Sequence, residues 1–66
     1  MPIVEVQLLA GRSAAQKAAL AREVTSAVGQ VLGCEPDRVQ VLIHEVTEGQ
    51  WYRAGSPINP VEAEAQ

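Results

Sequence analysis

The strongest constraint on the fold of this chain is a helical segment placed between two segments of alternating apolar and polar residues. In residues 3–9 (IVEVQLL) the alternation puts Val4, Val6 and Leu8 on one face of a strand. Residues 38–46 (RVQVLIHEV) alternate in the same way and predict a second strand. Two strands joined through a helix form a βαβ unit, whose strands run parallel with a right-handed crossover. The sequence therefore predicts an α/β fold with a single βαβ unit.

The segment between the predicted strands carries the start signal and the periodicity of an amphipathic helix. Ser13, followed three residues later by Gln16, has the pattern of a capping box, so we expect the helix to begin near Ala14. Gly33 is a typical C-terminal stop. Apolar residues recur every three or four positions and predict one buried stripe: Leu20, Val24, Ala27, Val28, Val31 and Leu32.

The chain has 66 residues, which leaves little material for a core, and such chains bury only about 60% of their unfolded surface. A single cysteine, Cys34, excludes an internal disulfide, and one cysteine with one histidine is too few for a zinc site. Two strands alone do not make a stable sheet. We therefore expect one domain over residues 1–66 that is stabilised by self-association and holds no metal.

The residues after Thr47 contain turn-forming glycines and prolines around Trp51 and Tyr52. They predict a loop or a short hairpin, and we expect this tail to lie on a neighbouring subunit. The turn-forming residues are Gly49, Gly55, Pro57 and Pro60.

Charge and composition exclude several classes of partner. The net charge of -3 has the wrong sign for a protein that binds the phosphate backbone of nucleic acids. No apolar run approaches the roughly 20 residues of a membrane span, and the N-terminus lacks the pattern of a signal peptide. We therefore expect a cytoplasmic protein without a nucleic-acid or membrane partner.

Pro2 carries the most chemical information. A small residue at position 2 permits removal of the initiator methionine, which would leave the secondary amine of Pro2 at the start of a strand. Such an amine is a general base when apolar surroundings and nearby cations lower its pKa toward the working pH. Arg12 or Arg53 would supply the cation and bind a carboxylate. The alternative is a structural proline, tolerated at a strand edge where no amide donor is needed.

Several segments together resemble one enzyme family. These segments are the Met-Pro-Ile start, LLAGRS after the first strand, QKAALAREVTSAV in the helix, RVQVLIHEV as the second strand, and the aromatic Trp51. Over nearly its whole length the chain resembles the 4-oxalocrotonate tautomerases. The resemblance implies βαβ subunits that pair into dimers and assemble as hexamers, which would supply the missing partners of the sheet.

The resemblance also implies roles for three residues. Pro2 matches the amino-terminal proline that shuttles a proton between carbons of a dienol or enol acid. Arg12, in the GRS motif, matches the arginine that binds a substrate carboxylate. Trp51 matches an aromatic position whose apolar side chain helps to keep the proline amine neutral. The resemblance implies no cofactor.

Gln40 departs from the family pattern. It stands where the namesake enzyme has an arginine that polarises the carbonyl end of the substrate. A glutamine donates a hydrogen bond to a developing enolate oxygen without adding charge, so weaker stabilisation or a different substrate is expected. Arg53 is a candidate replacement, and Arg38 is another, because on the predicted strand it shares the face of Gln40.

These observations predict a cofactor-independent keto-enol tautomerase of an unsaturated 2-hydroxy or 2-oxo carboxylic acid. Pro2 is the expected base, Arg12 and Trp51 bind the substrate, and Gln40 or Arg53 faces the oxygen that gains charge. The expected assembly is a homohexamer with sites built across subunits. One alternative is a hydratase, dehalogenase or decarboxylase that uses Glu45, Glu48 or Asp37. Another is a catalytically silent subunit of a mixed oligomer.

Overall fold

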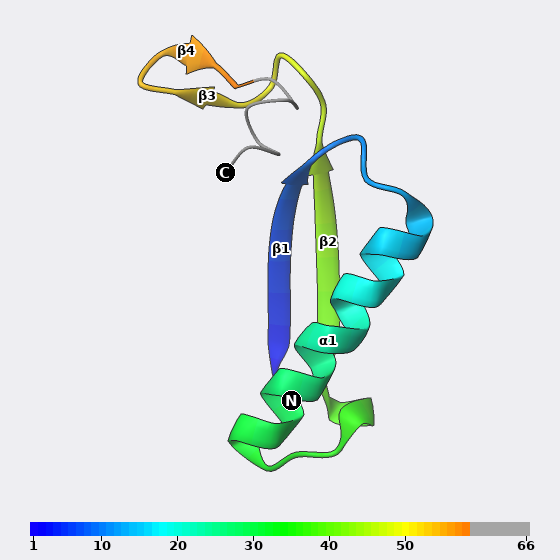
Figure 1. Cartoon of the computed structure of the whole chain (residues 1–66). Helices are drawn as coiled ribbons and strands as arrows, with labels where there is room; N and C mark the ends of the chain where they lie inside the picture. Colours follow the sequence, from blue (N-terminus) through cyan, green and yellow to red (C-terminus); the bar gives the residue numbers. More distant parts are fainter. Residues whose placement is uncertain (59–66) are drawn as a thin grey trace.

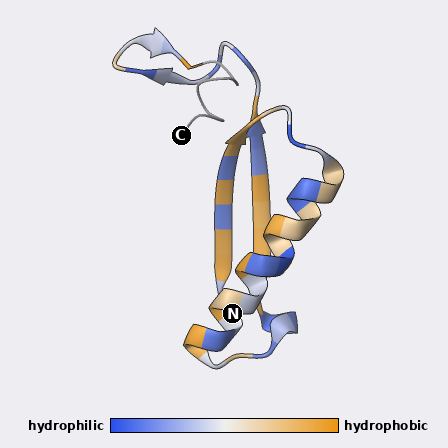
Figure 2. Cartoon of the chain, in the orientation of Figure 1, coloured by the Kyte–Doolittle hydropathy of each residue, from blue (hydrophilic) through white to orange (hydrophobic). Residues whose placement is uncertain are grey.

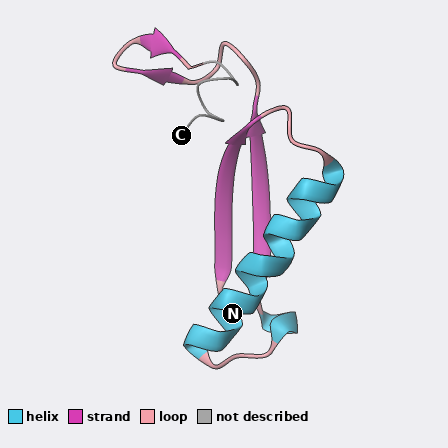
Figure 3. Ribbon diagram, in the orientation of Figure 1, coloured by secondary structure: helices cyan, strands magenta, loops and turns pink. Residues whose placement is uncertain are grey.

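The computed structural model describes residues 1–58, which form a βαβ unit followed by a small hairpin (Figures 1 and 3). Strand β1 (Ile3–Leu9) and strand β2 (Gln40–Val46) lie side by side and run parallel, and helix α1 (Ala14–Leu32) connects them and lies alongside the sheet. The predicted βαβ fold and the short C-terminal hairpin are confirmed. The elements are β1 (Ile3–Leu9), α1 (Ala14–Leu32), the short 3-10 helix η1 (Pro36–Arg38), β2 (Gln40–Val46), β3 (Tyr52–Arg53) and β4 (Ser56–Pro57).

The register of the sheet follows from the alternation of residues along its two strands (Figure 2). Ile3 stands opposite Gln40 at one end, and Leu9 stands opposite Val46 at the other. Val4 and Val6 of β1 and Val41 and Ile43 of β2 are half-buried and share the face that carries Glu45, and Glu45 contacts α1. That face is therefore the one covered by the helix, and the opposite face is open.

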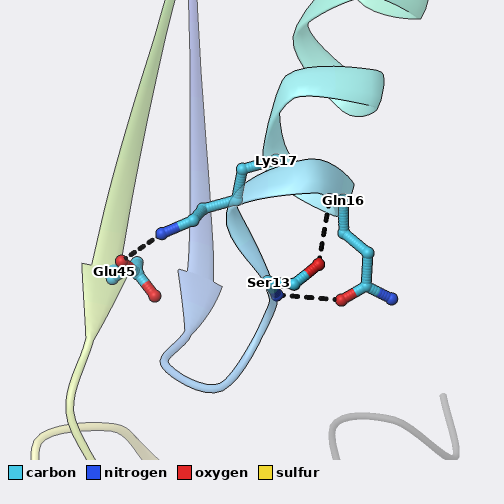
Figure 4. Close-up of polar contacts among 4 residues, drawn as sticks. All are labelled: Ser13, Gln16, Lys17 and Glu45. Atoms are coloured by element: carbon cyan, nitrogen blue, oxygen red, sulfur yellow. Dashed lines mark hydrogen bonds and ion pairs between the residues drawn. The ribbon is translucent and has the colours of Figure 1, made fainter.

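Helix α1 begins and ends where its capping residues predict. The Ser13 side chain accepts a hydrogen bond from the Gln16 backbone N–H at 3.1 Å, and the Gln16 Oε1 accepts one from the Ser13 backbone N–H at 3.0 Å (Figure 4). This reciprocal pair is a capping box, and it satisfies two amides that the helix itself leaves free. At the other end Gly33 has a φ of 67° and donates its N–H to the Gly29 carbonyl.

The second strand is shorter than the sequence predicts. It begins at Gln40 rather than at Arg38, because Pro36 starts the 3-10 helix η1, in which the Val39 N–H donates to the Pro36 carbonyl at 3.1 Å. Proline fixes the φ that the first residue of such a turn requires. Arg38 therefore lies outside the sheet, and the expectation that it shares a strand face with Gln40 is wrong.

The predicted buried stripe of α1 is only partly covered. Leu20, Val24 and Val28 are half-buried, whereas Val31 is 82% exposed and Leu32 is 62% exposed. Ala27 is exposed as well. A 19-residue helix is roughly 28 Å long and a seven-residue strand roughly 23 Å, so the last turn of α1 extends past the sheet.

Burial within the single chain is low. In the part of the chain that the structure describes, Leu9 and Ile58 are the buried hydrophobic residues. On the open face of the sheet, Ile3 is 57% exposed and Leu42 is 46% exposed. Large apolar side chains on an open face indicate a surface for association.

The hairpin extends beyond the carboxyl ends of β1 and β2 (Figure 1). Arg53 pairs with Ser56 across a two-residue loop in which Ala54 and Gly55 have φ values of 53° and 80°. Two positive φ values are typical of the type I′ turns that close tight hairpins. The expected contact of this tail with a neighbouring subunit stays a prediction, as does the single domain over 1–66. Pro60 and the rest of residues 59–66 lie outside the described residues.

Candidate active site

The predicted site residues fall into two groups at opposite ends of the sheet. We call the first group the proline end; it contains Met1, Pro2 and Gln40, where both strands begin. The second group, the arginine end, contains Arg12, Trp51 and Arg53, which follow the carboxyl ends of the strands. Because seven-residue β1 spans roughly 23 Å, one copy of the chain does not bring Pro2 and Arg12 together.

At the proline end, backbone hydrogen bonds fix the position of Pro2. Its carbonyl accepts a hydrogen bond from the Gln40 backbone N–H at 3.0 Å, and its side chain is half-buried. The Gln40 side chain extends in the same direction, and its Nε2 donates to the Met1 Sδ at 3.3 Å. The structure thus places the Gln40 amide beside the side chain of the N-terminal residue, Met1. With Met1 attached, the Pro2 nitrogen is a tertiary amide and has no free lone pair for a proton.

At the arginine end, Arg12 lies in the turn between β1 and α1 and is half-buried. It lines a pocket of about 260 Å³ together with Leu8, Gln16, Lys17 and Leu20. The pocket joins cationic and apolar side chains next to the N-terminus of α1, an arrangement that suits an anion.

Lys17 is a pocket residue to which the sequence assigns no role. Its Nζ lies 2.7 Å from the Glu45 Oε1, and this ion pair ties the first turn of α1 to the end of β2 (Figure 4). The signal in the sequence is its position four residues after the capping Ser13, which places it in the first turn beside the GRS motif. Glu45 is thereby engaged with a cation, while Glu48 and Asp37 are exposed on a turn and on η1.

Trp51 and Arg53 are held by the hairpin. The Trp51 carbonyl accepts a hydrogen bond from the Ile58 N–H at 2.9 Å, and Trp51 is half-buried. Arg53 is exposed on β3. Within one chain the structure therefore does not bring Arg53 near Gln40, which occupies the position of the family arginine that Arg53 is a candidate to replace.

Metal and membrane features are absent from the described residues. Residues 1–58 hold no group of three or more histidine, cysteine, aspartate or glutamate side chains that could bind a metal ion. Over the same residues, no helix is both long enough and apolar enough to cross a membrane.

Comparison with known proteins identifies the family. Residues 2–59 match the family model described as tautomerase enzyme. The chain belongs to the tautomerase family. A probable tautomerase from Halalkalibacterium halodurans is 39% identical over 59 residues, which cover 89% of this chain and 97% of that protein. One from Streptococcus mutans is 42% identical over 55 residues, covering 83% of this chain and 90% of that protein. This family assignment places the chain among the isomerases.

Solved structures of tautomerase homologues have the same fold. TomN, a 4-oxalocrotonate tautomerase homologue in the tomaymycin biosynthetic pathway, is 32% identical with a TM-score of 0.83, covering 98% of this chain and 97% of that one. A chain of the heterohexamer 4-oxalocrotonate tautomerase from Chloroflexus aurantiacus is 30% identical with a TM-score of 0.83, and both chains are covered completely. The match to the 4-oxalocrotonate tautomerase homologues confirms the resemblance drawn from the GRS motif and the βαβ pattern.

Proposed function

We propose that the chain is a cofactor-independent keto-enol tautomerase of an unsaturated 2-hydroxy or 2-oxo carboxylic acid, with Pro2 as the general base. The observation that carries the proposal is the position of Pro2. It immediately precedes β1, its carbonyl accepts a hydrogen bond from the Gln40 backbone N–H at 3.0 Å, and the Gln40 Nε2 donates to the Sδ of the preceding residue, Met1. A base and a hydrogen-bond donor held next to each other are what an enolate-forming reaction needs.

The reaction requires that Met1 be removed. The Pro2 nitrogen is then a secondary amine, which takes the hydroxyl proton of the enol and delivers a proton to carbon. The carbon–carbon double bond shifts, a ketone forms, and no atoms are gained or lost, so no cofactor is needed. While the proton moves, the substrate oxygen carries negative charge, and the Nε2 of Gln40 or the guanidinium of Arg53 would stabilise it.

The separation of the two ends supports a site shared between copies of the chain. Since Pro2 and Arg12 of one copy lie at opposite ends of β1, the Arg12 that binds the substrate carboxylate would come from a second copy. Trp51 would exclude water from the shared site. Exposed Ile3 and Leu42 on the open face support an assembly that covers them. We propose a homohexamer, in line with the resemblance to 4-oxalocrotonate tautomerases. A cytoplasmic location stays a prediction.

The experiment compares the ketonisation of phenylenolpyruvate, followed in the ultraviolet, by the unaltered protein and by Pro2→Ala. Intact mass must first show that Met1 is gone. We expect kcat/KM to fall by roughly 100-fold or more in Pro2→Ala, as typical of a lost general base. An unaltered protein that ketonises the enol no faster than buffer, or a Pro2→Ala protein with full activity, contradicts the proposal.

A silent subunit of a mixed hexamer is the second candidate function. Two observations favour it: the similarity to a chain of a heterohexamer tautomerase, and the uncharged Gln40 beside Pro2. It predicts that the purified chain assembles without activity and that Pro2→Ala changes nothing measurable. Activity of the purified chain alone excludes it.

A further inference from the structure

We infer that Lys17 is a positioning residue of the arginine end: by pairing with the Glu45 carboxylate, it keeps that carboxylate from opposing an anion in the pocket that Arg12 lines. This inference rests on the proposed tautomerase function, because it concerns how the same site admits the carboxylate of its substrate. Lys17 acts through Glu45 rather than by binding the substrate.

The position of Glu45 beside the pocket is the first support. Glu45 stands opposite Leu8 in the register of β1 and β2, and both side chains lie on the face of the sheet that α1 covers. Leu8 lines the pocket of about 260 Å³. Neighbouring strands lie about 5 Å apart, so the Glu45 side chain begins at that distance from a residue of the pocket lining. The fold thus places a carboxylate next to a pocket that also has Arg12 in its lining.

The contact made by Lys17 is the second support. Its Nζ lies 2.7 Å from the Glu45 Oε1, which is the distance of a charge-assisted hydrogen bond. Lys17 lines the pocket itself, and its side chain reaches from the first turn of α1 to the end of β2 (Figure 4). The pair is partly covered, so water and salt screen it less than a fully exposed pair. The ammonium group therefore compensates the charge of Glu45 at the edge of the pocket.

The balance of charge determines what this pair does for the pocket. Among the described residues that line it, Arg12 and Lys17 are cationic and none is acidic. With the adjoining Glu45 included, one positive charge is in excess, which suits a substrate with a carboxylate. Without Lys17, the Glu45 carboxylate would offset the charge of Arg12, either by repelling the substrate or by pairing with Arg12 itself.

The experiment measures kcat and KM for the ketonisation of phenylenolpyruvate by four proteins after Met1 removal. These are the unaltered chain, Lys17→Ala, Glu45→Gln and the double variant. We expect Lys17→Ala to raise KM by about tenfold with little change in kcat, because substrate binding is weakened before and during the reaction alike. Glu45→Gln should keep KM at or below the unaltered value. The double variant has the unaltered net charge and should recover most of the lost kcat/KM.

The pattern across the four proteins separates this role of Lys17 from two others. If Lys17 bound the substrate directly, the double variant would stay as impaired as Lys17→Ala. If the pair only anchored α1 to β2, Glu45→Gln would be as impaired as Lys17→Ala. Either result contradicts the inference. Arg22→Ala is the matched control, because it removes a cation from an exposed position of α1 and should leave KM unchanged.

A binding measurement separates failure of the inference from failure of the proposed function. Phenylacetate carries a carboxylate but is no enol, so its dissociation constant, measured by NMR titration, does not depend on Pro2 chemistry. Weaker binding to Lys17→Ala that Glu45→Gln restores supports the inference even if phenylenolpyruvate is not turned over, a result that would contradict only the proposed function. Equal binding to Lys17→Ala and the unaltered chain, or binding to neither, contradicts the inference.

A variant that fails to fold does not protect the inference. If Lys17→Ala does not fold, Glu45→Gln still tests it, because the remaining cations should hold phenylacetate at least as tightly as in the unaltered chain. Weaker binding of phenylacetate by Glu45→Gln contradicts the inference.

Discussion

The proline end and the arginine end of the sheet differ in what holds their side chains. Pro2 and Gln40 are fixed by the hydrogen bond that opens the β1–β2 ladder. Arg12, Trp51 and Arg53 instead lie on a turn and a hairpin that follow the strands. Rigid elements suit a base that must be placed accurately, while loops suit groups that recognise a substrate. The proposed reaction centre and its recognition groups are therefore held by different kinds of structure.

The two ends also differ in charge. The arginine end has Arg12, Lys17 and the N-terminus of α1, whereas the proline end has a neutral amide. Neither end by itself combines a base with a carboxylate-binding cation. The proposed site therefore exists only where the proline end of one copy meets the arginine end of another.

The largest effect is expected from a substitution on the open face of the sheet, the surface through which copies of the chain would associate. Leu42→Asp places a charge on the open face of the sheet, where an assembled protein would bury it at a cost of several kcal/mol. We expect dissociation of the oligomer and loss of ketonisation activity, measured by sedimentation and by the enol assay. Thr47→Asp, an exposed position just past β2, is the control and should keep both. A monomeric Leu42→Asp protein with full activity would show that one copy suffices.

Loss of the carboxylate-binding cation is expected to have the next largest effect. Arg12→Ala should lower kcat/KM by about 100-fold, because a two-pronged hydrogen-bonded ion pair contributes roughly 3 kcal/mol. Arg22→Ala removes the same charge from an exposed position of α1 and should leave the rate unchanged. Equal losses in both variants would mean that net charge, rather than a contact of Arg12, supports activity.

A smaller effect is expected from the ion pair that anchors the arginine end. Glu45→Gln removes the partner of the Lys17 ammonium, now at 2.7 Å, from a pair whose side chains are 29% and 37% exposed. The free energy of unfolding should fall by less than about 1 kcal/mol, because partly exposed pairs are screened by water and salt. Urea denaturation measures the change. A destabilisation several times larger would show that the pair is buried in the assembly.

The smallest effect is expected at the turn of the hairpin. Ala54 has a φ of 53°, which an alanine adopts at a cost, and Ala54→Asn creates the Asn-Gly pair that type I′ turns prefer. We expect a gain in stability of about 0.5 kcal/mol with no change in activity, measured by thermal unfolding. Gly55→Ala is the opposite control, because Gly55 also has a positive φ, and it should destabilise the protein. A stabilised hairpin that slows the enzyme would indicate that the hairpin moves during turnover.

Local sequence signals predict most of the fold. The capping box of Ser13 and Gln16 and the stop at Gly33 predict the bounds of α1, since both act through neighbouring residues. The alternation predicts β1 fully. It fails at the start of β2, because the periodicity of residues 38–40 looks like a strand while Pro36 locally favours a 3-10 turn.

Local sequence signals predict the residues of the candidate site but not their arrangement in space. The sequence indicates Pro2, Arg12 and Gln40 individually, but their separation into two ends follows from the parallel register, which is a property of the folded sheet. The exposed Val31 and Leu32 show the same limit, because a helical stripe predicts which face is apolar and not which chain covers it. The sequence assigns no role to Lys17, because its partner Glu45 lies 28 residues further along the chain.

A site shared between copies is tested by unfolding two inactive variants, Pro2→Ala and Arg12→Ala, mixing them and refolding them together. In a site shared between copies, random assembly from equal amounts restores an intact pair at about one site in four. A shared site predicts that the mixture regains ketonisation activity that neither variant has when refolded alone. Mixed oligomers that form, as shown by native mass spectrometry, and yet stay inactive would contradict it.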